Sequence, residues 1–334
     1  MRILVCGGAG FIGSNFIHHM LEKHKDIKIV NYDKLTYAGN LDNHKHLDSD
    51  PRLTFVHGDI CDMQKLLPIV KEVDFVVNLA GESHNDRSVH MGSRDFVMTD
   101  VVGVQTILDA VRVSPNVKKF VNVSTDEVYG SLDLNDGRAF DESWNFNANI
   151  PYSAAKAGGD MMCKAFFHTF KTPVIVTHCT NNYGPYQFPE KLIPFSILRV
   201  LENKPIAIYG DGKHVRDWIF VRDHCEGLEL ALLNGEAGET YNFGGRAEKS
   251  NLEIAKLILK FMGRPADMMQ FITDRPGHDR RYAMNPAKAE KELGWKIQHN
   301  FEEALPKTVD WYPKNIWWVG NIKNRGAQLN PHIK

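Results

Sequence analysis

Cysteine is scarce in this sequence, and no two cysteines lie close together. The chain contains five, Cys6, Cys61, Cys163, Cys179 and Cys225, with no Cys-x-x-Cys pair. An odd, scattered set argues against a disulfide framework and against a structural zinc site. We therefore expect no metal site and a reduced, cytoplasmic environment.

Long apolar runs and an excess of one charge are also missing. No apolar run reaches the ~18 residues that a membrane span requires, and the formal net charge is −1. Neither a membrane nor a nucleic acid is therefore expected as a partner. Residues 2–6 read as a strand, so no signal peptide is expected either. The sequence shows no repeats, and its 334 residues allow for about two domains at ~150 residues each.

What the sequence does have is a glycine-rich turn after its first strand. The stretch Gly7-Gly8-Ala9-Gly10-Phe11-Ile12-Gly13 opens a helix that we expect over residues 14–24. Glycines let the backbone approach a pyrophosphate closely, and the helix N-terminus offers free N–H groups and a partial positive charge. A second strand, 27–32, ends in Asp33, 20 residues beyond Gly13, where a carboxylate accepts hydrogen bonds from an adenosine ribose. The pattern predicts NAD rather than NADP, a preference that the adjacent Lys34 weakens.

Further strands alternate with helices along the first half of the chain. We expect strands at 53–57, 75–80, 121–125 and 174–177, with helices at 100–113 and 152–170 among those between them. This alternation predicts a doubly wound parallel (Rossmann) sheet. Asp59, after the third strand, is expected either to contact the adenine or to cap the following helix. His44 and His46 form a His-x-His on a polar segment, and we expect them at the surface.

The fifth strand ends in a hydroxyl and two carboxylates, Thr125, Asp126 and Glu127. Ligands of open α/β sheets bind at the carboxyl ends of the strands, so these side chains are predicted to face a site. Tyr152 and Lys156 follow at positions i and i+4, which share one helix face. The alternatives are a capping pair on a solvated edge and a tyrosine at a helix start with an exposed lysine. Residues 132–150 read as a polar loop over the site.

The second half of the chain has a different texture, with prolines and aromatic residues between short elements. We predict an NAD-binding domain at 1–183 and a smaller, mixed α/β substrate domain at 184–320, with a later strand within 209–243 returning to the first sheet. Expected strands lie at 206–212, 216–221 and 240–244, and expected helices at 222–233 and 251–262. The charged run 274–281 is either a solvated loop or a diphosphate clamp, because arginine forks match phosphate oxygens. The last ~20 residues receive no assignment.

These motifs together resemble the extended short-chain dehydrogenase/reductase family. The resemblance rests on three motifs: Gly-Gly-x-Gly-x-x-Gly, the stretch from Ser124 to Gly130, and Tyr-x-x-x-Lys. Within the family, these motifs resemble those of nucleoside-diphosphate-glucose 4,6-dehydratases of the dTDP-glucose type. The resemblance covers roughly residues 1–315. The sequence departs from the family pattern at Gly81, where the family often has Ala, and at Ala155, where it often has Ser.

The resemblance implies an enzyme that oxidises a nucleotide-linked glucose at C4, eliminates water across C5 and C6, and reduces C6. dTDP-glucose is the favoured substrate and UDP-glucose the next. Tyr152 would be the base for the 4-hydroxyl; lowering its pKa from ~10 to near 7 takes ~4 kcal/mol, supplied by Lys156 and the nicotinamide. Thr125 would orient the 4-oxygen, Glu127 would be the C5 base and Asp126 the C6 acid.

Two further sets of residues are implied by the resemblance. Those expected around NAD are Gly7, Gly10, Phe11, Ile12, Gly13, Asp33, Lys34, Thr36, Asp59, Ile60, Leu79, Ala80, Glu82, Thr99, Tyr152, Lys156 and Asn182. Those expected around the nucleotide sugar are Ser83, Thr125, Asn181, Lys191, Leu192, Tyr209, Arg216, Asn251, Arg275 and His278.

The resemblance also implies a homodimer through the helices at about 100–113 and 153–170. Apolar Met161, Met162, Phe166 and Phe167 suit that interface and an ordinary core equally well. Two alternative functions stay open: a sugar-nucleotide epimerase on the same fold, which the Asp126–Glu127 pair disfavours, and a non-catalytic NAD-binding protein, which the complete set of reacting residues disfavours.

Overall fold

A seven-stranded parallel sheet forms the larger part of the molecule. The computed structural model describes residues 1–90, 92–326 and 329–330. The strand order is β10-β6-β5-β4-β1-β2-β3, and every neighbouring pair is parallel. The strands are β1 (Arg2–Cys6), β2 (Lys28–Asp33), β3 (Leu53–His57), β4 (Phe75–Asn78), β5 (Lys119–Thr125), β6 (Val174–Cys179) and β10 (Thr240–Phe243). The predicted doubly wound sheet is confirmed.

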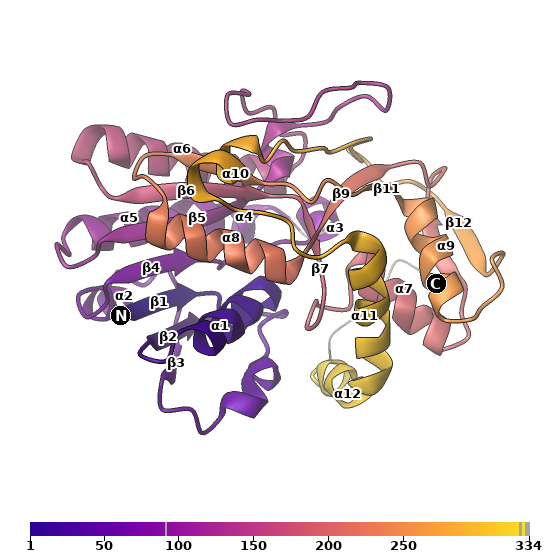
Figure 1. Ribbon diagram of the computed structural model, residues 1–334, viewed down its shortest axis with the longest axis horizontal. Helices are drawn as coiled ribbons and strands as arrows, with labels where there is room; N and C mark the ends of the chain where they lie inside the picture. Colours follow the sequence, from indigo (N-terminus) through magenta and orange to yellow (C-terminus); the bar gives the residue numbers. More distant parts are fainter. Residues whose placement is uncertain (91, 327–328, 331–334) are drawn as a thin grey trace.

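Helices cover both faces of this sheet because its strands are apolar on both sides. In β1, Ile3 and Val5 face one layer and Leu4 and Cys6 the other. One layer contains α1 (Phe11–Lys23), α8 (Val221–Asn234) and α10 (Ala287–Leu293). The other contains α2 (Met63–Val70), α5 (Val104–Arg112) and α6 (Pro151–Phe170). Figure 1 shows α1 and α8 in front of the sheet.

The topology places a ligand crevice at the carboxyl end of β1. The chain runs from β1 outward to β2 and β3 and then crosses to β4 on the other side of β1. Such a switch point leaves a crevice between the loops that leave the two halves of the sheet. The loops after β1, β4 and β5, which carry the predicted motifs, therefore converge there.

A smaller, mixed α/β part surrounds a second core, at the right of Figure 1. It has a three-stranded sheet in the order β11-β9-β7 and a parallel pair, β12-β8. The strands are β7 (Asn181–Tyr183), β8 (Ile206–Tyr209), β9 (Val215–Phe220), β11 (Glu248–Ser250) and β12 (Met269–Ile272). The helices are α7 (Leu192–Leu201), α9 (Asn251–Phe261), α11 (Phe301–Lys314) and α12 (Ile316–Asn324).

The helix expected at 100–113 differs from the prediction at its start. Two short helices, α3 (Asn85–His90) and α4 (Arg94–Val97), precede it, and a π-helical turn, Met98–Gly103, joins α4 to α5. The polar loop 132–150 contains no helix or strand and is held by isolated bridges, including one between Phe140 and Met284.

The segment without a sequence assignment packs against the glycine-rich turn. Trp318 of α12 is 1% exposed, and its indole Nε1 donates to Asn43 Oδ1 at 2.7 Å. Asn43 Nδ2 in turn donates to the carbonyl of Ala9 at 3.0 Å. The expectation that His44 lies at the surface is wrong. It is buried in this contact, with Nε2 2.8 Å from the carbonyl oxygen of Gly8, whereas His46 is exposed.

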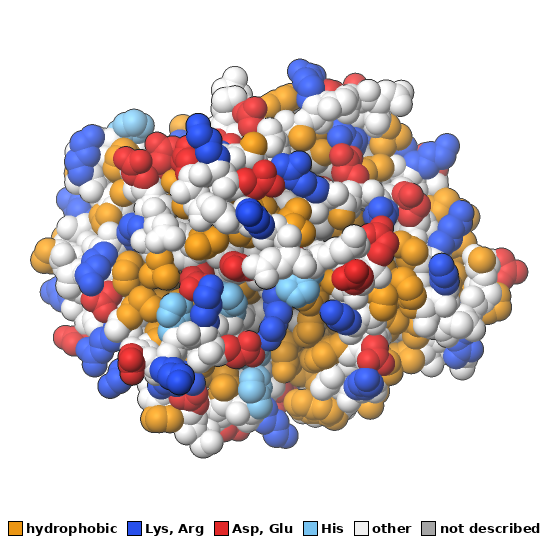
Figure 2. Space-filling view, viewed as in Figure 1, with side chains coloured by type: hydrophobic (Ala, Val, Ile, Leu, Met, Phe, Trp, Pro, Cys, Tyr) orange, Lys and Arg blue, Asp and Glu red, His pale blue; other side chains and the backbone are white. Residues whose placement is uncertain are grey.

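The surface carries charges of both signs. On the face seen in Figure 2, Lys and Arg side chains are interspersed with Asp and Glu side chains. Within the described ranges, no helix is both long enough and apolar enough to cross a membrane.

Candidate active site

Every residue that the sequence predicts for catalysis, cofactor or substrate lines one of three neighbouring cavities. The first contains all five catalytic candidates. It also contains Phe11, Ile12, Gly13 and Asn182, which are expected around NAD, and Ser83, which is expected around the sugar. The second contains Asp33, Lys34, Thr36, Asp59, Ile60, Leu79, Ala80, Glu82 and Thr99, and it shares Gly7 and Gly10 with the first. The third contains Leu192, Tyr209, Arg216, Asn251, Arg275 and His278, and it shares Asn181, Lys191 and Glu127 with the first. The three form a continuous crevice over the carboxyl ends of the strands.

The glycine-rich turn, which lines the first and second cavities, has the form of a dinucleotide cradle. A Cβ at Gly7, whose φ is +76°, would lie 2.4 Å from the backbone nitrogen of Ala80, and one at Gly13 would lie 2.2 Å from the Gly7 carbonyl oxygen. Only glycine permits this approach. Helix α1 starts after Gly10 with no side-chain cap, so its first N–H groups face the crevice, which suits a diphosphate.

Asp33 braces the same turn. Its Oδ2 accepts from the backbone N–H of Ala9 at 2.9 Å and its Oδ1 from that of Leu35 at 2.7 Å. Lys34 Nζ lies 2.7 Å from Asp59 Oδ2, so its positive charge is partnered. The capping alternative for Asp59 is wrong, because Asp62 caps α2 by accepting from the backbone N–H of Lys65.

The two carboxylates after β5 occupy different environments. Asp126 is 2% exposed; burial raises the pKa of its carboxyl well above the usual range, and Glu127 raises it further. The capping alternative on a solvated edge is therefore wrong for Asp126. Burial also raises the pKa of Glu127, but Arg275 and Arg216 oppose that rise. Glu127 accepts a hydrogen bond from Asn85. Both carboxyl pKa values are raised, but that of Asp126 rises further, so Asp126 is favoured as the protonated member of the pair.

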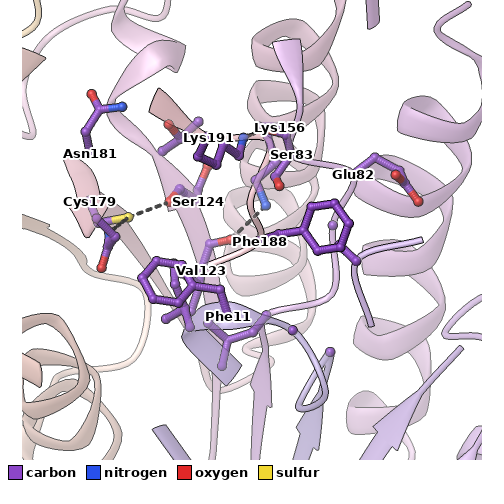
Figure 3. Close-up of a pocket in the computed structure, with 18 of the residues that line it drawn as sticks. Phe11, Glu82, Ser83, Val123, Ser124, Lys156, Cys179, Asn181, Phe188 and Lys191 are labelled. Carbon is purple, nitrogen blue, oxygen red and sulfur yellow. Dashed lines mark hydrogen bonds between the residues drawn. The ribbon is translucent and has the colours of Figure 1, made fainter. Parts of the chain in front are cut away.

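Tyr152 and Lys156 share the inner face of α6. They are 8% and 6% exposed, so the alternative of an exposed lysine is wrong. Lys156 Nζ donates to the carbonyl oxygen of Val123 at 2.7 Å (Figure 3) and lies 3.7 Å from Asp100 Oδ1.

In the protein alone, the expected lowering of the pKa of Tyr152 is not found. Burial raises this pKa well above 10, Glu127 and Asp100 raise it further, and a hydrogen bond with Thr125 opposes the rise. Burial is the largest influence on the phenol, and the ammonium of Lys156 lies 3.7 Å from Asp100 Oδ1. A lowered pKa of Tyr152 therefore depends on the other cation that we expected to act on it, the nicotinamide.

The charged run 274–281 divides into two functions. Arg280 and Arg281 are held in ion pairs with Asp211 and Glu248, at 3.1 and 2.6 Å, and anchor the loop. Arg275 lines the third cavity together with Arg216, which is 6% exposed. The solvated-loop alternative is thus wrong for Arg281, which is 8% exposed. The guanidinium groups of Arg275 and Arg216 face the crevice.

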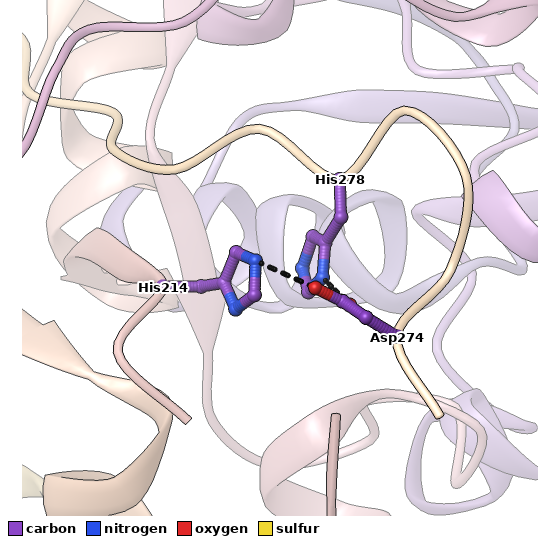
Figure 4. A group of neighbouring side chains, drawn as sticks. All are labelled: His214, Asp274 and His278. Atoms are coloured by element: carbon purple, nitrogen blue, oxygen red, sulfur yellow. Dashed lines mark hydrogen bonds and ion pairs between the residues drawn. The ribbon is translucent and has the colours of Figure 1, made fainter. Parts of the chain in front are cut away.

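His278 belongs to a compact cluster at the edge of the third cavity (Figure 4). Its Nδ1 lies 2.6 Å from Asp274 Oδ1, and His214 Nε2 lies 3.2 Å from Asp274 Oδ2. The three side chains are close enough to share an ion. However, the two imidazoles stack at 3.6 Å and 13°, so their in-plane lone pairs do not converge. The geometry favours a hydrogen-bonded cluster around one carboxylate.

Several residues around this site were not predicted from the sequence, and two of them contact predicted catalytic side chains. Asn85 bonds Glu127, and Asp100 lies beside Lys156. A signal for Asp100 existed: it stands four residues before Val104, on the apolar stripe of the predicted helix. A carboxylate on such a stripe is rarely buried without a partner.

Known proteins match almost the whole chain. Residues 4–308 match the family model described as GDP-mannose 4,6 dehydratase. The dTDP-glucose 4,6-dehydratase of Xanthomonas campestris pv. campestris (strain B100) is 45% identical over 98% of this chain and 97% of its own. The crystal structure of dTDP-glucose 4,6-dehydratase from Bacillus anthracis in complex with NAD superposes with a TM-score of 0.90 at 45% identity, covering 96% of this chain and 99% of that one. That of the Streptomyces venezuelae enzyme, also with NAD, gives 0.92 at 44%, covering 95% and 98%.

The chain therefore belongs to the nucleoside-diphosphate-sugar 4,6-dehydratase family of the extended short-chain dehydrogenases/reductases. It is an enzyme of the hydro-lyase class, and its cofactor is NAD. The glycine-rich turn, the uncapped start of α1 and Asp33 fit that cofactor.

Proposed function

We propose that this enzyme converts dTDP-glucose to dTDP-4-keto-6-deoxyglucose. The observation that carries the proposal is the pair Asp126 and Glu127 in the same cavity as Tyr152 and Lys156. One set of residues suits oxidation at C4, and the other suits loss of water from C5 and C6. An epimerase requires only the first set. The presence of the buried acid Asp126 beside the carboxylate of Glu127 therefore favours the dehydratase.

Oxidation at C4 is assigned to the residues at the start of α6 and the end of β5. NAD, when bound, accepts the hydride from sugar C4 and later returns it to C6. Tyr152 takes the proton of the 4-hydroxyl, and Thr125 donates a hydrogen bond that orients O4. Lys156, fixed by the Val123 carbonyl, supplies positive charge near the phenol oxygen.

Elimination is assigned to the two carboxyl groups. The C4 ketone acidifies the C5 proton, which Glu127 removes while Asp126 protonates the C6 hydroxyl as it leaves as water. Glu127 then returns the proton to C5. The enzyme is restored when Tyr152 releases its proton and Asp126 regains one from solvent.

The nucleotide assignment rests on the relatives, which are named for dTDP-glucose. The third cavity supports a nucleoside diphosphate through Arg216 and Arg275, because guanidinium groups match phosphate oxygens. One methyl group in a pocket is worth only ~1–3 kcal/mol, so a difference between dTDP and UDP of about 10-fold to 200-fold is expected.

The test is to incubate the purified enzyme with dTDP-glucose or with UDP-glucose, without added reductant. The 4-keto-6-deoxy product is followed by its absorbance in alkali. Product from dTDP-glucose with little from UDP-glucose supports both the reaction and the base. Equal product from both would overturn the dTDP preference. No product from either, with NAD bound, would overturn the dehydratase. An epimerised sugar that retains O6 would establish the alternative.

A homodimer through α5 and α6 is proposed as well. Met161 and Phe170 of α6 are 55% and 49% exposed, and Val113, the residue after the end of α5, is 49% exposed. Phe166, in contrast, is buried in the chain's own core. Exposed apolar side chains of this size on adjacent helices favour association. Sedimentation is expected to show a dimer that Met161→Lys together with Phe170→Glu converts to a monomer.

A further inference from the structure

Asp100 is a buried carboxylate with no hydrogen-bond donor among the described residues. It is 1% exposed, and both of its oxygens lack a partner within hydrogen-bond distance. A buried carboxylate in this state is costly unless a charge faces it. The facing charge is Lys156, whose Nζ lies 3.7 Å from Asp100 Oδ1.

The backbone is shaped to place Asp100 there. It lies on the π-helical turn Met98–Gly103; π-helix occurs mostly as single turns within α-helices, and such turns are frequent at functional sites. A Cβ at Gly159 would lie 2.2 Å from the Asp100 carbonyl oxygen, so α6 packs directly on the turn. A Cβ at Gly81 would lie 2.9 Å from Asp100 Oδ1. Gly159 therefore lets the backbone of the turn approach α6, and Gly81 leaves room for the carboxyl group beside Lys156.

The charged groups around Asp100 come from two elements, helix α6 and the loop after β4. Helix α6 contributes Lys156, Asp160 and the phenol of Tyr152, and the loop after β4 contributes Glu82. Burial raises the pKa of Asp100 to about 7; Lys156 opposes the rise, and Glu82 and Asp160 add to it. Asp100 is thus able to change its charge near neutral pH.

We propose that Asp100 is a positioning residue that controls, through Lys156, how readily Tyr152 gives up its proton. When Asp100 is ionised, it offsets the charge of Lys156 and favours the neutral phenol. When Asp100 is protonated, the full charge of Lys156 acts on the phenol oxygen and favours phenolate. This inference rests on the proposed role of Tyr152 as the base for the 4-hydroxyl.

The test measures the ionisation of Tyr152 without turnover. The NAD-bound enzyme is titrated by the ultraviolet absorbance of ionised tyrosine, and the titration of Tyr152→Phe is subtracted. In the same way, the titration of the double variant Asp100→Asn, Tyr152→Phe is subtracted from that of Asp100→Asn, which isolates the ionisation of Tyr152 in that background. Removing one negative charge from this buried site is expected to lower the midpoint of Tyr152 by about 1 pH unit.

Two further variants separate this effect from a loss of structure. Gly81→Ala keeps the carboxyl group but displaces it from Lys156, so a smaller shift in the same direction is expected. Asp109→Asn makes the same chemical change on α5, away from Lys156, and is expected to leave the midpoint unchanged. Thermal unfolding of each variant reports whether it is folded.

The outcomes distinguish this inference from the proposed function. A midpoint in Asp100→Asn equal to or higher than that of the wild type overturns the inference, even if the enzyme is an active dehydratase. If Asp100→Asn fails to fold, an unshifted Gly81→Ala overturns it. A lowered midpoint in an enzyme that forms no 4-keto-6-deoxy product would support the coupling and overturn the function.

Discussion

Asn85 donates a hydrogen bond of 2.9 Å from Nδ2 to Oε2 of Glu127. A donor to the charged form of a carboxylate favours ionisation, so Asn85→Ala is expected to raise the pKa of Glu127. If Glu127 is the C5 base, the acid limb of the pH profile of kcat shifts upward by about 1 pH unit, since a hydrogen bond to a charged group is worth ~1.5–3 kcal/mol. Asn116→Ala, which loses an amide hydrogen bond to Val73 far from the site, serves as the control. An unshifted limb contradicts this role for Asn85.

Substitution of Asp126 separates oxidation from elimination. Asn has nearly the same shape but no proton to give the C6 hydroxyl, so Asp126→Asn should form product ~10²-fold to 10⁴-fold more slowly. Oxidation at C4 should persist, and the absorbance of reduced nicotinamide should build up when dTDP-glucose is added. Asp133→Asn, on the exposed loop, is expected to behave like the wild type. Normal product formation by Asp126→Asn would remove it as the acid.

The ion pair between Lys34 and Asp59 bears on the choice between NAD and NADP. Asp59→Asn leaves Lys34 as an unpaired cation near Asp33, and an added phosphate becomes less unfavourable there. We expect the ratio of the Kd for NADP to that for NAD to fall by about 10-fold, or ~1.4 kcal/mol. Asp62→Asn, a helix cap outside the cavity, is the matched control. Equal ratios of the two Kd values in Asp59→Asn and Asp62→Asn would show that the Lys34–Asp59 ion pair does not control the choice of cofactor.

Glu229 should make the fold sensitive to acid. Burial acts to raise its pKa, but hydrogen bonds from His19, Lys23 and His24 outweigh burial and lower the pKa to about 2 from 4.5. A depressed carboxyl pKa stabilises the fold above the unfolded value, and this stability is lost as the pH falls from 4.5 toward 2. The shift corresponds to about 3 kcal/mol.

Denaturant unfolding at neutral pH and at roughly pH 3 tests this linkage. Glu229→Gln should be destabilised at neutral pH, and its difference from the wild type should shrink in acid. Glu22→Gln removes an exposed pair with Arg222 and should cost less than ~1 kcal/mol at both values. A constant difference for Glu229→Gln would show that its charge is not linked to folding.

The large sheet could be predicted from sequence because its signals are local. Apolar strands of β-branched residues, the glycine-rich turn and the carboxylates after β5 each occupy a few consecutive positions. Topology then brings them to one edge of a parallel sheet. Positions such as Asp33 and Thr125 follow from strand ends alone.

Other features depend on contacts between distant segments. His44 lies on a polar stretch, and only the packing of α12 and α1 buries it. Helix α11 contains Pro306 and Pro313, which disfavour a helix on local grounds, yet Phe301 and Tyr312 anchor it in the second core. The partners of the Lys156 ammonium come from β5 and the π-helical turn, which no spacing in the sequence reveals.

The contact between Trp318 and Asn43 also constrains the order of assembly. It spans 275 residues of sequence, and Asn43 holds the Ala9 carbonyl of the glycine-rich turn. Closing so long a loop is slow compared with pairing neighbouring strands. During synthesis, the parallel sheet emerges well before the indole that braces this turn. The nucleotide cradle is therefore among the first parts of the protein to be made and among the last to be fully braced.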